Sequence, residues 1–291
     1  MSHFSVMTDD FAMDSRTLAG SLEVRLQAIA NAGFTQLMVT PEDLVNHPQG
    51  PDAAVAAIHA SGLRVTGMQT LRDFEGLSGP LHQYKVDVAK SMLSLCHQLG
   101  CPLLVVSAST LARADGDSTA LVRNLRQLAM LAIPMNIRIA YQASAQGHTV
   151  KTFGQAWDLV WQADMPNLGL CLDALDVLSC AAPQDDLDFL EADKLFLVQL
   201  ADHIDEARTA VHVFPGEGEH NEALASLLTT LHELGYRGNY NLAVVNDDYR
   251  QMPAATVARR AGASALWLGQ DVLQRSVPLP NQIRLKRRNA G

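Results

Sequence analysis

Short apolar runs alternate with amphipathic stretches along the chain, and this alternation is the feature that most limits the possible folds. The stretches between the runs repeat apolar residues at helical spacing; Leu22, Leu26 and Ile29 share one face, and Gly33 follows where that helix would end. Regular strand and helix alternation predicts a parallel sheet. The eight runs that predict strands are 4–7, 35–40, 64–71, 103–109, 137–143, 168–174, 195–202 and 240–245.

Eight such units in a chain of 291 residues predict one closed α/β barrel of the (β/α)8 type, which typically needs about 250 residues. The competing fold, a doubly wound open sheet, typically carries a glycine-rich phosphate loop after its first strand. The predicted first strand is followed by TDDFAMDS, with no G-x-G-x-x-G pattern nearby. We therefore expect a barrel over residues 1–275 and a polar, basic tail over residues 276–291.

The bulk composition excludes several functional classes. The formal net charge of -9 argues against a nucleic-acid-binding surface, and no apolar run approaches the ~18 residues of a membrane span. The first residues are too polar and acidic for a secretory signal. The cysteines, Cys96, Cys101, Cys171 and Cys180, lack C-x-x-C spacing and fall mostly in apolar stretches. We expect reduced core thiols and a soluble, cytoplasmic protein with no nucleic-acid or membrane partner.

Polar residues gather at the carboxyl ends of the later strands, where barrels place their active sites because the loops there converge on the axis. Each polar side chain either fills the barrel top with hydrogen bonds or serves a ligand, and placement on adjacent strands favours the ligand. The four strand ends carry Tyr141 and Gln142, Asp173 followed by Asp176, Gln199 followed by Asp202 and His203, and Ala243.

Six segments carry a resemblance to a known family: RDFEG (72–76), IAYQASAQGHTVKTFGQAWDLVWQAD (139–164), LGLCLDALDVLS (168–179), KLFLVQLAD (194–202), VFPGEGE (213–219) and YRGNYNLAVVNDDYR (236–250). In this order they resemble bacterial 3-dehydroshikimate dehydratases of the xylose-isomerase-like barrel superfamily. The resemblance implies a lyase or an isomerase that acts on a small hydroxy acid or sugar-like ligand. It also implies, by analogy alone, a homo-oligomer.

Members of that family resemble one another in holding a divalent metal with a Glu, an Asp, a Gln and a Glu on strands five to eight. The resemblance places the Asp at Asp173 and the Gln at Gln199, but the two Glu positions hold Gln142 and Ala243. Hard cations such as Mg²⁺ and Mn²⁺ are held by oxygen ligands, and their affinity follows ligand charge. Two missing carboxylates predict a weakened metal site at Asp173 and Gln199, and no resident cofactor is expected.

Other family positions also differ. The family's His after the strand-six Asp matches Asp176, its His in the loop after strand five matches Thr149, and its Arg before FPG matches His212. His148 stands beside the lost loop histidine. These changes leave His148, Asp176 and His212 as candidate acid–base groups. A rebuilt site for Zn²⁺, Co²⁺, Mn²⁺ or Mg²⁺ would have to draw on such residues and on His203.

Arg72 is shared with the family, and its planar guanidinium suits a ligand carboxylate because it donates two parallel hydrogen bonds. An ion pair with Asp73 or Glu75 is the alternative role. The predicted substrate-binding set is Arg72, Gln142, Asp173 and Gln199.

The stretch FPGEGEH (214–220) looks like a phosphate loop, but its glutamates would repel a phosphate. It therefore predicts a structured turn beside the barrel mouth.

Three functional hypotheses follow. The first is a diverged, metal-poor relative that binds a cyclic hydroxy acid or sugar-like ligand and lacks dehydratase activity. The second is an active lyase or isomerase, with a rebuilt site or metal-free acid–base chemistry. The third is a non-catalytic regulatory or structural partner, for example of a true dehydratase, because the same barrel hosts many functions.

Overall fold

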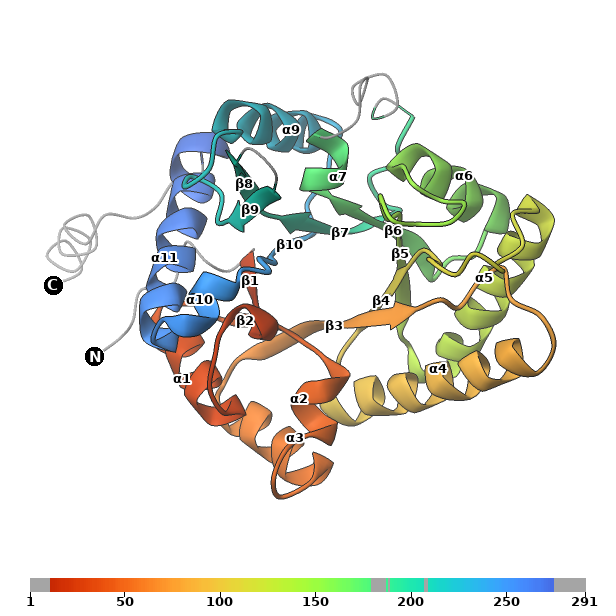
Figure 1. The fold of residues 1–291 in the computed structure, drawn as a ribbon, viewed down its shortest axis with the longest axis horizontal. Coiled ribbons are helices and arrows are strands. Elements are labelled where there is room, and N and C mark those ends of the chain that lie inside the picture. Colours follow the sequence, from red (N-terminus) through yellow and green to blue (C-terminus); the bar gives the residue numbers. More distant parts are fainter. Residues whose placement is uncertain (1–10, 179–186, 188, 207–208, 275–291) are drawn as a thin grey trace, which may run out of the picture.

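The computed structural model describes residues 11–178, 187, 189–206 and 209–274, and it confirms the predicted α/β barrel. Parallel strands close in the order β1-β10-β7-β6-β5-β4-β3-β2, and helices surround them (Figure 1). The barrel strands are β1 (Phe11–Asp14), β2 (Gln36–Val39), β3 (Arg64–Arg72), β4 (Leu103–Ser107), β5 (Arg138–Gln142), β6 (Leu168–Asp173), β7 (Leu195–Leu200) and β10 (Asn239–Leu242).

Helices link successive strands and bury their apolar faces against the barrel. In α1, for example, Leu22, Leu26 and Ile29 are buried, and Gly33 follows with the positive φ of 93° that ends the helix, as predicted. The helices are α1 (Leu22–Asn31), α2 (Pro41–Val45), α3 (Pro51–Ala60), α4 (Gly79–Leu99), α5 (Ser118–Ala132), α6 (Phe153–Ala163), α7 (Ala174–Leu178), α9 (Asn221–Glu233), α10 (Asp247–Gln251) and α11 (Ala254–Trp267), with short turns at Ser15–Thr17, Ile133–Met135 and Leu268–Val272.

The first barrel strand differs from the prediction. The barrel closes through β1, whereas the predicted run 4–7 lies outside the described residues. β1 pairs in parallel with β10 and β2, with Phe11 opposite Tyr240. All four of its residues are buried, and a strand enclosed on both faces needs no alternation of apolar and polar residues. The short run FAMD therefore gave too weak a pattern to be recognised.

The other seven predicted strands are confirmed, with one change after β7. That strand ends at Leu200, and Asp202 instead opens an antiparallel hairpin of β8 (Asp202–Glu206) and β9 (Thr209–Val213), which was not predicted. Figure 1 shows the hairpin close to α9. The hairpin carries His203 and His212, two of the histidines considered as candidate site residues from the sequence.

The barrel interior is apolar at its centre and polar at its carboxyl end. A separate buried cluster includes one residue from each of β1, β4, β5, β6 and β7 that we use to trace the inward face: Ala12, Val105, Ala140, Cys171 and Leu197. Strand side chains alternate between the two faces, so the residues two positions later share the inward face. Those residues are Asp14, Ser107, Gln142, Asp173 and Gln199. The strand alternation therefore assembles a polar barrel mouth above an apolar plug.

Two further expectations can be compared with the structure. Cys96, Cys101 and Cys171 are buried and free, as predicted, whereas Cys180 and the predicted tail 276–291 lie outside the described residues. Across the described ranges, no helix has both the length and the apolar character that a membrane crossing requires.

Candidate functional site

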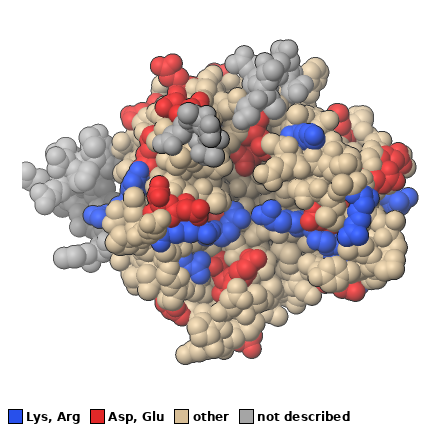
Figure 2. Space-filling view, viewed as in Figure 1, with Lys and Arg blue, Asp and Glu red and all other residues tan. Residues whose placement is uncertain are grey.

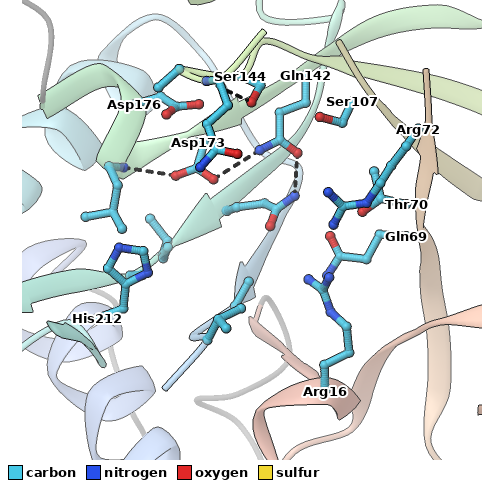
Figure 3. A pocket seen from close by; sticks show the side chains of 18 residues that line it. Arg16, Gln69, Thr70, Arg72, Ser107, Gln142, Ser144, Asp173, Asp176 and His212 are labelled. Carbon is cyan, nitrogen blue, oxygen red and sulfur yellow. Dashed lines mark hydrogen bonds between the residues drawn. The ribbon is translucent and has the colours of Figure 1, made fainter. Parts of the chain in front are cut away.

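A cavity of about 430 Å³ opens at the carboxyl ends of the barrel strands (Figure 3). Six of the seven predicted site residues line this cavity, and Ala243 also lines it. These six are Arg72, Gln142, Asp173, Asp176, Gln199 and His212. His148 is not among the lining residues; its side chain is exposed, and its backbone N–H donates to the Ser109 carbonyl at 2.8 Å.

A chain of hydrogen bonds joins the three strand-end residues on one wall. Gln142 Nε2 donates to Asp173 Oδ2 at 3.1 Å, and Gln199 Nε2 donates to Gln142 Oε1 at 2.9 Å. The other carboxylate oxygen, Asp173 Oδ1, accepts from the Leu175 N–H at 3.0 Å. Both ends of the Gln142 amide are therefore occupied by protein groups.

The donor set of this wall does not fit the family's divalent metal. An ionised carboxylate only accepts hydrogen bonds, so Gln142 must turn its NH₂ group, and not its oxygen, toward Asp173. A cation held by Asp173 would then face N–H donors. The position that would add a second carboxylate ends in the methyl group of Ala243, which lines the cavity. One carboxylate and two amides are a poor set for a hard cation.

The two aspartates on this wall have raised pKa values. Burial raises the pKa of Asp173 to about 6, against the opposing effect of hydrogen bonds from Leu175, Asp176 and Gln142. Burial, and then the charge of Asp173, raise the pKa of Asp176 to about 7. Near neutral pH this pair can both accept and release a proton, which is what general acid–base catalysis requires.

His212 reaches the cavity from the β8–β9 hairpin. Partial desolvation, and then the charge of the neighbouring His203, lower the pKa of His212. Its imidazole is therefore biased toward the neutral form, which can accept a hydrogen bond on one nitrogen and donate from the other. Figure 3 shows His212 on the same side of the cavity as Asp173 and Asp176.

The opposite wall is basic and was only partly predicted. Figure 3 shows Arg16, Gln69, Thr70 and Arg72 facing the aspartates across the cavity. Arg16 forms a two-pronged ion pair with Asp14, with Nε and Nη2 lying 3.1 and 2.8 Å from Oδ2. Gln69 Nε2 donates to the same oxygen. Sequence analysis missed Arg16 because the first strand was placed too early; β1 ends at Asp14, so Arg16 is a strand-end residue.

Arg72 does not form the ion pairs considered as its alternative role. Asp73 accepts from the Thr110 N–H at 2.9 Å and lies 3.9 Å from Lys85 Nζ. Glu75 accepts from the Ser109 N–H, so both carboxylates are engaged elsewhere. In the part of the chain that the structure describes, no ion pair to the Arg72 guanidinium is present. This guanidinium therefore remains available to a ligand in the cavity.

Tyr141 shows why a strand end alone does not define the site. It precedes Gln142 on β5, so its side chain points out of the barrel and is fully buried. Its hydroxyl donates to Glu75 Oε1 at 3.0 Å. Burial, opposed by hydrogen bonds that include the one from Ser109, raises the pKa of Glu75. Tyr141 and Glu75 therefore belong to the packing behind the mouth.

The described residues contain a group that could hold a metal ion, and it lies outside the residues that line the mouth. Over the described ranges, one trio of His, Cys, Asp or Glu ligand atoms lies close enough to hold an ion, and it is Asp202, His203 and His220. Asp173, Asp176 and His212 are not part of it. His203 was considered from the sequence, whereas His220 was missed because it belongs to a distant loop.

The predicted turn at 214–220 is confirmed, and the contacts of Glu217 show what this acidic residue does there. The Glu217 N–H donates to the Phe214 carbonyl at 3.0 Å, which closes the turn. The Glu217 carboxylate accepts from Arg260 Nε at 2.7 Å and from the Tyr249 hydroxyl at 2.5 Å. This glutamate ties the turn to α10 and α11, so it has a structural role.

The chain belongs to the xylose isomerase-like TIM barrel family, whose sequence profile matches residues 26–268. It is 36% identical over 260 residues to a 3-dehydroshikimate dehydratase of Pseudomonas putida, an alignment that covers 87% of this chain and 40% of that protein. It is 26% identical over 191 residues to an inosose isomerase of Bacillus licheniformis, covering 62% of this chain and 67% of that protein.

A solved structure shows the same architecture. It is a xylose isomerase-like TIM barrel/4-hydroxyphenylpyruvate dioxygenase fusion protein, with a TM-score of 0.84 and 32% identity over 97% of this chain and 45% of that one. The chain thus spans less than half the length of both the Pseudomonas dehydratase and the fusion protein. The predicted resemblance to xylose isomerase-like barrels is confirmed, and relatives of the chain include proteins named 3-dehydroshikimate dehydratase.

Proposed function

We propose that the cavity binds a small cyclic hydroxy acid or sugar-like ligand, and that metal-dependent dehydratase activity has been lost. The observation that carries this proposal is the pairing of two unlike walls: Arg16 and Arg72 on one side, and the Asp173, Gln142 and Gln199 chain on the other. A guanidinium suits a carboxylate, while carboxylates and amides suit hydroxyl groups. The ligand's acid group would therefore lie toward Arg72.

Two further observations support this ligand class. The relatives are named for 3-dehydroshikimate, a cyclic hydroxy acid, and for inosose, a cyclic polyhydroxy ketone. Figure 2 shows Lys and Arg side chains in a row across the middle of the viewed face, although the whole chain carries a net charge of -9. Local positive charge would favour an anionic ligand.

Calorimetric titration of chelator-treated protein with 3-dehydroshikimate and with an inosose tests this proposal. Hydrogen bonds to charged groups contribute about 1.5–3 kcal/mol, so Arg72→Gln is expected to weaken binding of the acid by roughly 10–100-fold. The uncharged inosose should bind the variant and the parent chain alike. Arg123→Gln, at an exposed arginine of α5, is the matched control. Failure of the folded chain to bind either compound, or equal effects of both substitutions, would overturn the proposal.

A second candidate is an active lyase or isomerase that works without metal. The pKa values of Asp173 and Asp176 are raised to about 6 and about 7, and these values favour this candidate. A general base is most effective when its pKa lies near the pH at which the enzyme works. Turnover in chelator-treated protein would then rise through about pH 6–7 as the base ionises, and Asp176→Asn would lower kcat. Binding without turnover in any of these samples would exclude this candidate.

A further inference from the structure

A cluster of metal-binding residue types lies outside the cavity, where the β8–β9 hairpin meets the start of α9. Asp202 and His203 open β8, and His220 is the N-cap residue of α9. One ligand atom from each of these three residues lies within 4.8 Å of the other two. None of the three lines the barrel mouth. These residues are called the hairpin-base cluster.

The Asp202 carboxylate is fully buried but only half satisfied. Its Oδ1 accepts from the backbone N–H groups of His203 at 2.7 Å and of His220 at 3.2 Å. Its Oδ2 is buried and has no hydrogen-bond partner within the described ranges. The backbone of Gly218 packs so closely that a Cβ there would overlap the carboxyl group. An unpaired buried carboxylate oxygen is costly, and a cation would remove that cost.

The two histidines complete a ligand set. His203 Nε2 lies 3.1 Å from Asp205 Oδ1, and a histidine held by a carboxylate in this way presents its other nitrogen to a metal. His220 Nδ1 lies 3.3 Å from Asp202 Oδ1, yet it is buried and, among the described residues, makes no hydrogen bond. The rings of His203 and His220 stack with their centroids 4.0 Å apart. Nδ1 of each ring is therefore the nitrogen left for an ion.

We propose that Asp202, His203 and His220 form a binding site for a transition-metal ion such as Zn²⁺, separate from the barrel mouth. Two imidazole nitrogens and one carboxylate oxygen suit Zn²⁺ or Co²⁺, whereas Mg²⁺ and Ca²⁺ prefer oxygen ligands alone. Three protein ligands leave the fourth tetrahedral position open for water or a small anion.

An ion at this site would join two segments that are distant in sequence. The loop 214–220 already contacts the hairpin, because the Glu219 N–H donates to the His203 carbonyl at 3.1 Å. His203 also lies opposite His212 in the hairpin register, and His212 lines the cavity. The metal would therefore fix β8, the strand that pairs with β9, and β9 presents His212 to a ligand in the mouth.

The test uses the full chain, purified without a histidine tag, treated with chelator and titrated separately with Zn²⁺ and Mg²⁺ by calorimetry. We expect one Zn²⁺ per chain and much weaker binding of Mg²⁺. His203→Gln and His220→Gln should each weaken Zn²⁺ binding at least about tenfold, because loss of even an outer-shell partner costs 10–100-fold. His97→Gln, at an exposed histidine of α4, is the control and should change nothing.

Co²⁺ titration followed by visible absorption gives a second readout, since four-coordinate Co²⁺ absorbs much more strongly than the aqueous ion. The absorption should appear in the parent chain and in Asp173→Asn, and it should be lost in the two cluster variants. Circular dichroism establishes that each variant is folded. Zn²⁺ binding that survives both histidine substitutions, that depends on Asp173, or that is no tighter than Mg²⁺ binding would overturn the proposed site.

Discussion

The barrel mouth and the hairpin-base cluster differ in how their polar atoms are satisfied. In the mouth, where the family resemblance places a metal, the Gln142 amide bonds to both Asp173 and Gln199. In the cluster, Asp202 Oδ2 and His220 Nδ1 are buried without hydrogen-bond partners in the described part of the chain. Buried polar groups are normally paired. This difference is the reason for proposing a hydrogen-bonding ligand in the mouth and a cation at the cluster.

The largest expected effect comes from restoring carboxylates to the mouth. Gln142→Glu combined with Ala243→Glu recreates the ligand types Glu, Asp, Gln and Glu on adjacent strands. Two unit charges about 4 Å apart interact by about 4 kcal/mol at an effective dielectric constant of about 20. Two added carboxylates should therefore raise Mn²⁺ affinity at least about a hundredfold, or about 2.7 kcal/mol, in a calorimetric titration.

Ala145→Glu is the control for that double variant, because Ala145 lines the cavity from an exposed loop position away from the strand ends. It should raise Mn²⁺ affinity far less. If the double variant binds Mn²⁺ no better than Ala145→Glu does, the assignment of Gln142 and Ala243 to the family's ligand positions is wrong.

A smaller effect is expected on stability at Asp176. Its folded pKa of about 7 lies above the unfolded value of about 4, so the fold disfavours its charged form and stability is lost as pH rises between these values. Asp176→Asn should therefore raise the unfolding free energy by about 1–2 kcal/mol at pH 8, after allowance for solvent screening.

Urea denaturation at several pH values measures this difference. The difference in unfolding free energy between Asp176→Asn and the parent chain should disappear as the pH falls below about 4, where the aspartate binds a proton in both the folded and the unfolded state. A gap that is independent of pH, or a destabilising effect at pH 8, would contradict the raised pKa.

The smallest effect is expected at Tyr141, which lies behind the mouth. Tyr141→Phe removes the hydrogen bond to Glu75 and should lower stability by about 1 kcal/mol. Ligand binding in the cavity should not change, which calorimetry can verify. Tyr84→Phe, at a side chain that is 61% exposed, should leave stability unchanged. Loss of ligand affinity in Tyr141→Phe would mean that the two regions are coupled.

The sequence predicted most of the fold because seven barrel strands have strong apolar patterns and the helices end at glycines such as Gly33 and Gly100. It did not predict β1, since a four-residue strand that is buried on both faces shows no alternation. The β8–β9 hairpin was also missed, because the preceding strand was extended through Asp202.

The candidate site was predicted where it depends on strand ends and was missed where it depends on long-range packing. Gln142, Asp173 and Gln199 follow from the period-two alternation of their strands. Arg16 follows only when β1 is placed correctly. His220 approaches Asp202 because a turn folds back onto the hairpin, and no local sequence pattern records that contact.

The central claim is that the mouth binds its ligand without the family's metal chemistry. Its most direct test is the ultraviolet appearance of protocatechuate from 3-dehydroshikimate, with folded protein that is first stripped of metal and then supplied with Mg²⁺, Mn²⁺, Co²⁺ or Zn²⁺. We predict no turnover with any of these ions. Metal-dependent turnover that Asp173→Asn abolishes would contradict the claim, because it would mean that Asp173 and Gln199 still hold a catalytic metal.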